Sequence, residues 1–189
     1  MPSSVIRLIN RMYKINKIQL VNQSINVLWT VFAFIPVLWF WIEIGVDYWF
    51  YAFLLLAVLF SILPQKIFMK FNIGRSRKIY ERCGVKTFRK YVQDGDWGNS
   101  LINKPSSTRF YDVIEVKKYL TTIAMYERYH WSCFIFFLGS AIYAIFLGLA
   151  LFGIWLTAVN IIYNITSILL QQYNRIRIDS LIRKTYTLP

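Results

Sequence analysis

The sequence predicts an all-α membrane protein with four transmembrane helices and a cytoplasmic, partly amphipathic segment between the second and third helices. Hydrophobic residues make up 57% of the 189 residues and aromatic residues 19%, with a mean hydropathy of +0.42. These residues gather in long uncharged runs, which is typical of membrane proteins. All 22 Lys and Arg residues lie outside those runs: four precede residue 24, fourteen lie between Lys66 and Arg128, and four follow residue 174.

Residues 1–23 are expected to form a cytoplasmic N-terminal tail. Its basic residues recur at spacings of four, three and three, with apolar residues beside them: Arg7, Arg11, Lys14 and Lys17, flanked by Ile6, Ile9 and Tyr13. This pattern favours an amphipathic helix on the inner membrane surface. A simple topology signal explains the same residues equally well, so both interpretations stay open.

Residues 24–65 are expected to form a transmembrane hairpin. The run 24–42 is 19 residues without charge, long enough to cross a bilayer at about 1.5 Å per residue, and Pro36 predicts a kink in it. The run 48–65 is also uncharged and has Pro64 near its end. Three tryptophans surround the short acidic loop between the runs, as expected at the outer interface: Trp39, Trp41 and Trp49, beside Glu43 and Asp47.

The second half of the chain is expected to contain a cytoplasmic segment, a second hairpin and a C-terminal tail. Residues 66–130 mix basic and aromatic residues and are expected to form a cytoplasmic, membrane-associated segment whose last part, 112–128, is a helix that runs into the third span. Residues 131–170 are too long for one span, and Gly148 and Gly153 bracket an expected turn, so a second hairpin is predicted. Residues 171–189 form the cytoplasmic C-terminal tail.

The distribution of charge predicts orientation and excludes some partners. Because basic residues mark the cytoplasmic side, both termini are expected in the cytoplasm of a multi-pass protein of the cell (inner or plasma) membrane. The net charge of +13 lies next to the spans, so membrane lipids and no nucleic acid are the expected partners. A cleaved signal peptide and a structural disulfide are not expected. Homo-oligomers and another membrane protein stay open as partners.

The only histidine, His130, lies at the border between a basic stretch and an apolar stretch. Glu127 precedes it by three residues, so the two side chains share a helix face. A carboxylate there would orient the imidazole and favour its charged form, which suits a general base. The alternative is an interfacial histidine with a structural role. No metal is expected, because a di-iron carboxylate site needs two Glu-x-x-His motifs and this chain has one.

The fourth span carries a stripe of polar residues at spacings of three and four: Thr157, Asn160, Asn164, Ser167, Gln171 and Asn174. Polar side chains in hydrocarbon normally face protein or water. Hydrogen bonds between helices would account for two of them, and six in register favour a lined groove as well. At the end of the stripe, Tyr173, Arg175 and Arg177 are expected near the cytoplasmic surface, where the two arginines would bind phosphate oxygens or anchor the helix.

Several motifs resemble the glycosyl-4,4'-diaponeurosporenoate acyltransferase family over roughly residues 71–178. They are Glu127-Arg128-Tyr129-His130-Trp131, Asn164, Gln171-x-Tyr173-Asn174-Arg175-x-Arg177, and Gly84-Val85-Lys86-Thr87-Phe88-Arg89-Lys90 followed by Asp94-Gly95. The chain departs from the family pattern at three places: Met125-Tyr126, Gln172 and Ile176.

The resemblance implies transfer of a fatty acyl group to a hydroxyl of a glycosylated carotenoid or related lipid at the inner membrane surface. No cofactor is expected beyond an acyl-CoA-like donor as co-substrate. His130 would act as general base with Glu127 orienting it, and Gln171 or Asn174 would stabilise the oxyanion. Substrate binding is expected from Asn160, Asn164, Gln171, Tyr173, Asn174, Arg175, Arg177 and Asp94, the last of which is otherwise a turn residue. The alternative function is a non-enzymatic membrane subunit or small transport component that uses the stripe for assembly or permeation.

Overall fold

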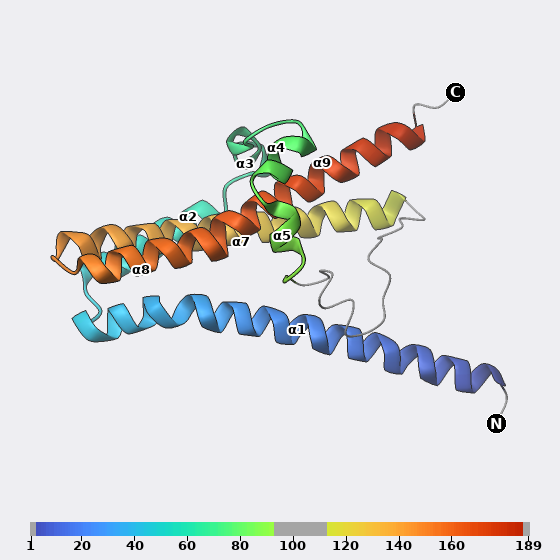
Figure 1. The fold of residues 1–189 in the computed structure, drawn as a ribbon, viewed down its shortest axis with the longest axis horizontal. Coiled ribbons are helices and arrows are strands. Elements are labelled where there is room, and N and C mark those ends of the chain that lie inside the picture. Colours follow the sequence, from blue (N-terminus) through green and yellow to red (C-terminus); the bar gives the residue numbers. More distant parts are fainter. Residues whose placement is uncertain (1–2, 93–112, 187–189) are drawn as a thin grey trace. The chain divides into compact units, whose positions relative to one another are not determined.

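The computed structural model describes residues 3–92 and 113–186, and these form helices joined by short turns (Figure 1). In chain order the elements are α1 (Ser3–Ile44), α2 (Tyr48–Ser61), α3 (Gln65–Phe68), the 3₁₀ helix η1 (Met69–Phe71), α4 (Arg77–Arg82), α5 (Val85–Arg89), α7 (Val113–Phe146), α8 (Ala150–Asn160), the π-helix η2 (Ile161–Ile165) and α9 (Thr166–Tyr186). The predicted all-α fold class is confirmed.

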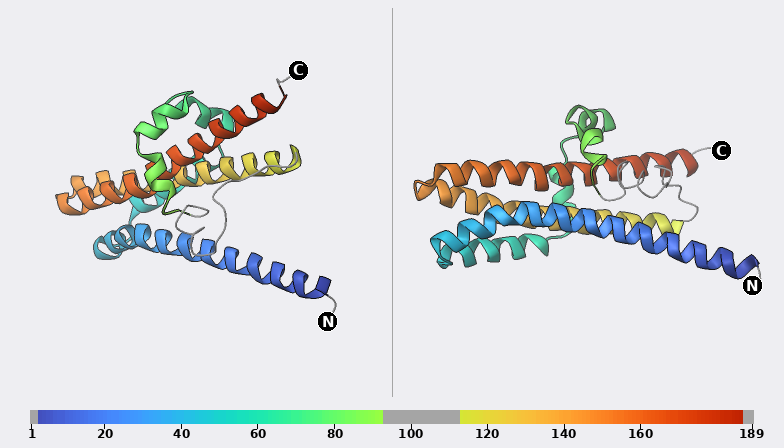
Figure 2. Two further views of the ribbon diagram at one scale, coloured as in Figure 1. Left: turned by 45° about the vertical axis from the view of Figure 1, so that its right-hand side comes forward. Right: turned by 60° about the horizontal axis from the view of Figure 1, so that its bottom comes forward.

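Two compact units make up the chain. The smaller contains Met1–Phe32 and Lys86–Arg109, and within it the indole nitrogen of Trp29 donates to the backbone oxygen of Tyr91 at 2.9 Å. The larger contains Ala33–Val85 and Phe110–Pro189. In the larger unit α7 packs against α2 and against the continuous rod formed by α8, η2 and α9 (Figure 2).

Within the described ranges, three helical segments are long and apolar enough to cross a membrane: Gln19–Ile44, Ile114–Phe146 and Ala150–Arg183. A fourth span exists if α2 and the α3–η1 pair, which are bent by 98° relative to each other, count as one. α1 runs through the sequence-predicted boundary at residue 23 without a break and contains Pro36. The predicted helix at 112–128 does continue into the third span, because α7 is one helix of 34 residues.

The second span ends earlier than the sequence predicted. α2 has 14 residues and is therefore about 21 Å long, which is less than a hydrocarbon core of about 30 Å. The physical reason is Pro64, which disfavours helical backbone at the preceding residue. Pro64 has extended backbone (φ −66°, ψ 146°) and precedes the first residue of α3. The chain consequently turns here and brings α3 against α7.

The two glycines expected to bracket the second turn have different roles. Gly148 lies in the turn and has a φ of +79°, a left-handed conformation that glycine adopts without steric cost. Gly153 instead lies inside α8. A Cβ on Gly153 would lie 2.4 Å from Cγ1 of Ile145 and 3.1 Å from the backbone oxygen of Ala141, so its missing side chain permits the close approach of α7 and α8.

Candidate active site

Glu127 is the centre of a buried polar cluster between α7, α9 and α3. Its side chain is fully buried, and it forms an ion pair with Arg175 through Oε2. Gln65 donates from Nε2 to the same oxygen at 2.7 Å, and Gln172 donates from Nε2 to Oε1 at 3.3 Å. A buried carboxylate is tolerated only with such partners, because desolvation of an unpaired charge is expensive.

The cluster extends from Gln172 to α4. The hydroxyl of Tyr80 lies 3.1 Å from Oε1 of Gln172 and 3.1 Å from the backbone oxygen of Gly74, so its single proton is shared between two acceptors. Burial raises the pKa of the Tyr80 phenol, which therefore remains a protonated donor at neutral pH. The residue that follows Gln172 on α9, Tyr173, donates from its hydroxyl to Glu81 at 3.3 Å.

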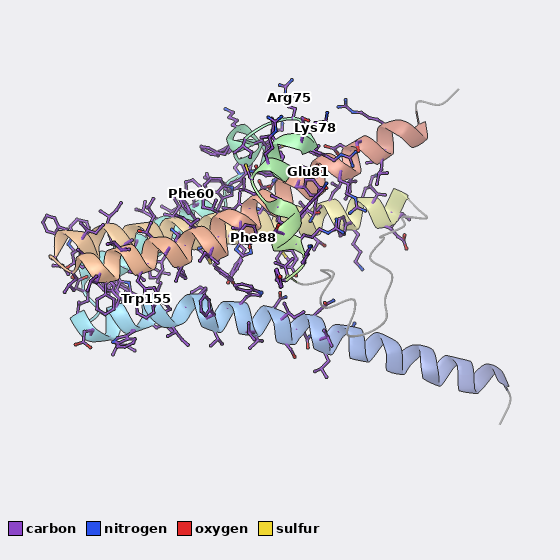
Figure 3. All side chains as sticks on the ribbon, viewed as in Figure 1. Phe60, Arg75, Lys78, Glu81, Phe88 and Trp155 are labelled. Atoms are coloured by element: carbon purple, nitrogen blue, oxygen red, sulfur yellow. The ribbon has the colours of Figure 1, made fainter. Side chains whose placement is uncertain are left out.

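The basic residues of the α3–α4 region have a different environment. Arg75 and Lys78 are exposed and extend outward from it, whereas Glu81 belongs to the contact with α9 (Figure 3). Lys66, Lys70, Arg77 and Arg82 are exposed as well. The surface of this segment is therefore strongly cationic, while its inner side supplies neutral polar groups to the cluster.

His130 lies one helical turn from Glu127 but has a different partner. Its Nδ1 is 3.2 Å from Oδ1 of Asn164, and its ring contacts those of Tyr129 and Tyr163 at centroid distances of 5.1 Å each. His130 is 9% exposed. The expected pairing of Glu127 with His130 is therefore not the arrangement in the structure, because Glu127 is engaged by α3 and α9 instead.

Asn160 and Asn164 lie in the interface between α7 and the α8–α9 rod. Asn164 donates from Nδ2 to Oδ1 of Asn160 at 2.8 Å, and Asn160 donates from Nδ2 to the backbone oxygen of Phe134 at 3.1 Å. Both are at most 2% exposed. Hydrogen bonding between helices, one of the two sequence interpretations, accounts for these two amides.

The polar stripe does not continue straight beyond Asn164. Thr157 is exposed and donates its hydroxyl to the backbone oxygen of Gly153. After Asn164, Ile168 and Gln172 continue its buried row at intervals of four residues, whereas Gln171 is only partly buried. The cause is η2, since a π-helical turn holds more residues than an α-helical one and shifts the inward face along the sequence. Gln172 replaces Gln171 in the cluster for this reason.

The other sequence-predicted site residues are distributed around the cluster. Tyr173 is buried, and Ser167, Asn174 and Arg177 are partly buried on α9. Arg175 reaches Glu127 rather than the surface. Asp94 lies outside the described residues. The sequence analysis did not predict Gln65, Tyr80 or Gln172 as site residues. For Gln65 the available signal was an amide directly after Pro64, and for Gln172 it was the departure from the family pattern.

Buried polar atoms without a hydrogen-bond partner in the described part of the chain also gather here. They are Oε1 of Gln65, Nη1 of Arg175, Nε1 of Trp131 and Oδ1 of Asn72. Trp131 follows Glu127 by one turn and contacts Phe71 and Phe68 at centroid distances of 5.3 and 6.4 Å, so it lies under the same α3–η1 segment. These donors and acceptors are available to a polar ligand or to water.

Neither the thiols nor the acids of the described residues form a metal-binding group. Within the ranges 3–92 and 113–186, no three His, Cys, Asp or Glu side chains lie close enough together to hold an ion. Cys83 is exposed, Cys133 is partly buried, and both are free thiols. The chemistry available at the cluster is therefore that of an imidazole, a paired carboxylate, a guanidinium and amides.

Comparison with known proteins places this site inside a family domain. Residues 64–184, more than half of the chain, match the family model described as glycosyl-4,4'-diaponeurosporenoate acyltransferase. The match includes Glu127, His130, Asn164 and Arg175. Searches of curated proteins and of solved structures found no match. The chain belongs to the glycosyl-4,4'-diaponeurosporenoate acyltransferase family.

Proposed function

We propose that the protein moves a fatty acyl group from a thioester donor on the cytoplasmic side to a hydroxyl of a glycosylated carotenoid or related lipid. Membership of the family supports a carotenoid acyltransferase function in general. The observation that carries the finer proposal is the position of His130. The chain's one imidazole is held by Asn164, one helical turn from a buried ion pair, within the matched domain.

The depth of His130 in the membrane suits a reaction between lipid-soluble and water-soluble substrates. Phe146, where α7 ends, follows His130 by 16 residues, a rise of roughly 24 Å. If this end of α7 lies at one boundary of a hydrocarbon core about 30 Å thick, His130 lies just inside the other. The basic residues of the α3–α4 region gather at that second boundary, which supports its assignment to the cytoplasm.

In the proposed reaction, His130 removes the proton of the acceptor hydroxyl while the hydroxyl oxygen attacks the thioester carbonyl carbon. The carbon–sulfur bond then breaks, and the leaving thiolate takes the proton from the imidazole. The products are an ester and a free thiol. Gln171 or Asn174 is the candidate donor to the oxyanion.

The donor phosphates are assigned to Arg175 and Arg177. Nη1 of Arg175 is buried and has no hydrogen-bond partner among the described residues, so it can donate to a phosphate oxygen. Glu127 contributes by holding the other end of this guanidinium and by tying α3 to α7 through Gln65. Its proposed role is thus to support the donor site rather than to orient His130.

The test combines cells and purified protein. Lipid mass spectrometry of cells with and without the protein identifies the acylated product, and the purified enzyme is then assayed with that acceptor. His130→Ala is expected to lower turnover by roughly 10²–10⁴-fold while the protein stays monodisperse in detergent. Thr157→Val, at an exposed position on α8, is the control and should retain full turnover. Near-normal turnover of His130→Ala would contradict the proposal.

The alternative of a non-enzymatic subunit or transport component relied on the polar stripe. Asn160 and Asn164 form their hydrogen bonds within this chain, which weakens the argument for an assembly seam. An unchanged lipid profile in cells that lack the protein, together with a co-purifying membrane protein, would favour that alternative.

A further inference from the structure

A chain of hydrogen bonds connects the backbone of α7 to His130 through two amides. It starts at the carbonyl oxygen of Phe134, passes through Asn160 at 3.1 Å and Asn164 at 2.8 Å, and ends at Nδ1 of His130 at 3.2 Å. Two pairs of residues four apart, one on α7 and one in the rod, face each other here. All three side chains are nine-tenths or more buried.

The starting point determines the direction of every bond in this chain. A backbone carbonyl oxygen only accepts, so Asn160 must present its NH₂ group to Phe134. Its Oδ1 then faces Asn164 and requires a donor, which the NH₂ group of Asn164 supplies. Asn164 is left with its Oδ1 toward His130. An oxygen at this position accepts only, so Nδ1 of His130 must carry a proton.

We infer that Asn160 and Asn164 are positioning residues that hold neutral His130 in the tautomer with its proton on Nδ1, which leaves Nε2 as the basic atom. The opposite tautomer would place two acceptors against each other in a buried interface. That is disfavoured by roughly ten- to a hundredfold, the equilibrium equivalent of one unpaired buried polar group. The assignment of Nε2 as the catalytic base rests on the proposed function, whereas the tautomer itself does not.

The amide chain also explains how the histidine can be oriented without Glu127. A carboxylate next to His130 would favour the imidazolium, whereas an amide oxygen orients the ring without adding a charge. Once Nε2 has taken a proton, Nδ1 still donates to Asn164, so the contact is compatible with both charge states. This role differs from the acceptor binding that the sequence predicted for the same two residues.

The single histidine permits a direct measurement. Protein labelled with ¹⁵N-histidine, purified with a histidine-free tag and placed in lipid nanodiscs, gives nitrogen signals from His130 alone. At a pH where the ring is neutral, Nδ1 is expected to show a protonated, pyrrole-type shift and Nε2 an unprotonated, pyridine-type shift. A majority of the Nε2-protonated form would overturn the inference.

Variants of the amides separate positioning from simple packing. Asn160→Leu does not touch His130, yet it frees the amide of Asn164 to rotate, so the Nδ1-protonated fraction should fall. Asn164→Leu should lower it as well, whereas Asn164→Asp keeps an accepting oxygen and should retain it. Thr157→Val is the matched control and should leave the spectrum unchanged. Spectra of both Leu variants that match the wild type would overturn the inference.

Kinetics provide a second, independent readout. Asn164→Leu should lower kcat and leave KM for the acceptor unchanged, because a positioning residue acts on the base rather than on substrate binding. An increase in KM at unchanged kcat would instead assign Asn164 to acceptor binding and overturn the positioning role. If His130→Ala stays active while the spectra are as expected, the proposed function fails and the tautomer assignment stands.

Discussion

The two ends of the larger unit differ in how completely their polar side chains are hydrogen-bonded. At the hairpin end, defined here by Asp47, Trp41, Ser140 and Tyr143, each polar side chain has its partner. Asp47 caps α2 by accepting from the backbone nitrogens of Trp49 and Phe50, and it accepts from the hydroxyl of Tyr143 at 2.6 Å. Trp41 donates from Nε1 to Ser140 at 2.9 Å, and its ring stacks on that of Tyr143.

At the His130 end, by contrast, the polar groups include a buried ion pair, and several of them are incompletely paired. Glu127 and Arg175 form a buried ion pair, and donor or acceptor atoms of Gln65, Arg175 and Trp131 lack partners in the described structure. A fully hydrogen-bonded network stabilises a helical bundle. Buried polar groups without partners destabilise it, and such groups are typically retained where they bind a ligand. The difference is consistent with a structural role for the hairpin end and with the proposed assignment of the reaction to the His130 end.

The largest effect on stability is expected from breaking the ion pair at the His130 end. Glu127→Ala should destabilise the protein by about 3–5 kcal/mol, because it leaves the guanidinium of Arg175 buried and unpaired. The measurement is thermal unfolding in detergent. The double variant Glu127→Leu with Arg175→Leu should recover much of that loss, since no charge remains. Equal stability of Glu127→Ala and the wild type would show that this ion pair is solvated.

At the hairpin end, the hydroxyl of Ser140 is expected to matter through its indole partner. Ser140→Ala leaves Nε1 of Trp41 buried without an acceptor and should cost about 1–3 kcal/mol in the same unfolding assay. Adding Trp41→Phe removes the orphaned donor and isolates the coupling between the two residues. The turnover of folded Ser140→Ala should equal that of the wild type. A loss of turnover would contradict a purely structural role for the hairpin end.

A smaller effect is expected from the cap of α2. Asp47→Ala removes the side-chain acceptor for the nitrogens of Trp49 and Phe50 and should cost about 1 kcal/mol. Asp47→Asn should retain most of the stability, because Asn is an equally good capping residue. Melting temperatures of the two variants test this. If Asn is as destabilising as Ala, the carboxylate contact with Tyr143 matters more than the cap.

The smallest expected effect is the pH dependence of the stability that Asp47 contributes. The hydrogen bond from Tyr143 is the largest contribution that lowers the pKa of Asp47 below its ordinary value of 3.8. A lowered pKa in the folded state contributes stability above the ordinary value, and this contribution is lost as the pH falls through the folded pKa. The melting-temperature difference between wild type and Asp47→Asn should therefore shrink on acidification below about pH 4. A difference that grows with acid would contradict this assignment.

Long-range pairing was the part of the site that the sequence could not predict. Glu127 and His130 are three residues apart, and this spacing suggested that they pair. In the structure, Glu127 instead meets Arg175 and Gln65, which are 48 and 62 residues away. Spacing on one helix identifies which side chains share a face. Which neighbour that face meets depends on how α3 and α9 pack.

Two local features of the backbone also made the structure differ from the arrangement that the sequence predicted. Pro64 ended α2 early, and the sequence contained its signal, since proline disfavours a helix at the preceding residue. The π-helical turn in η2 had no comparable signal, because residues 161–165 are ordinary helix formers in an apolar run. The extra residue in that turn shifts the inward face, so that Gln172 lies in the cluster in place of Gln171.

The sequence by itself determined the fold class, the uncharged segments that can cross a membrane, the helix that joins the central segment to the third span, and the family. These follow from composition, run length and motif identity, which are local properties of the chain. Only the tertiary structure decided that Glu127 supports Arg175, that Asn164 holds His130, and that Gln65 and Tyr80 join the cluster. Hydrogen-bond partners in a helical bundle are set by which faces meet, and that depends on bends, π-helical turns and close glycine contacts acting together.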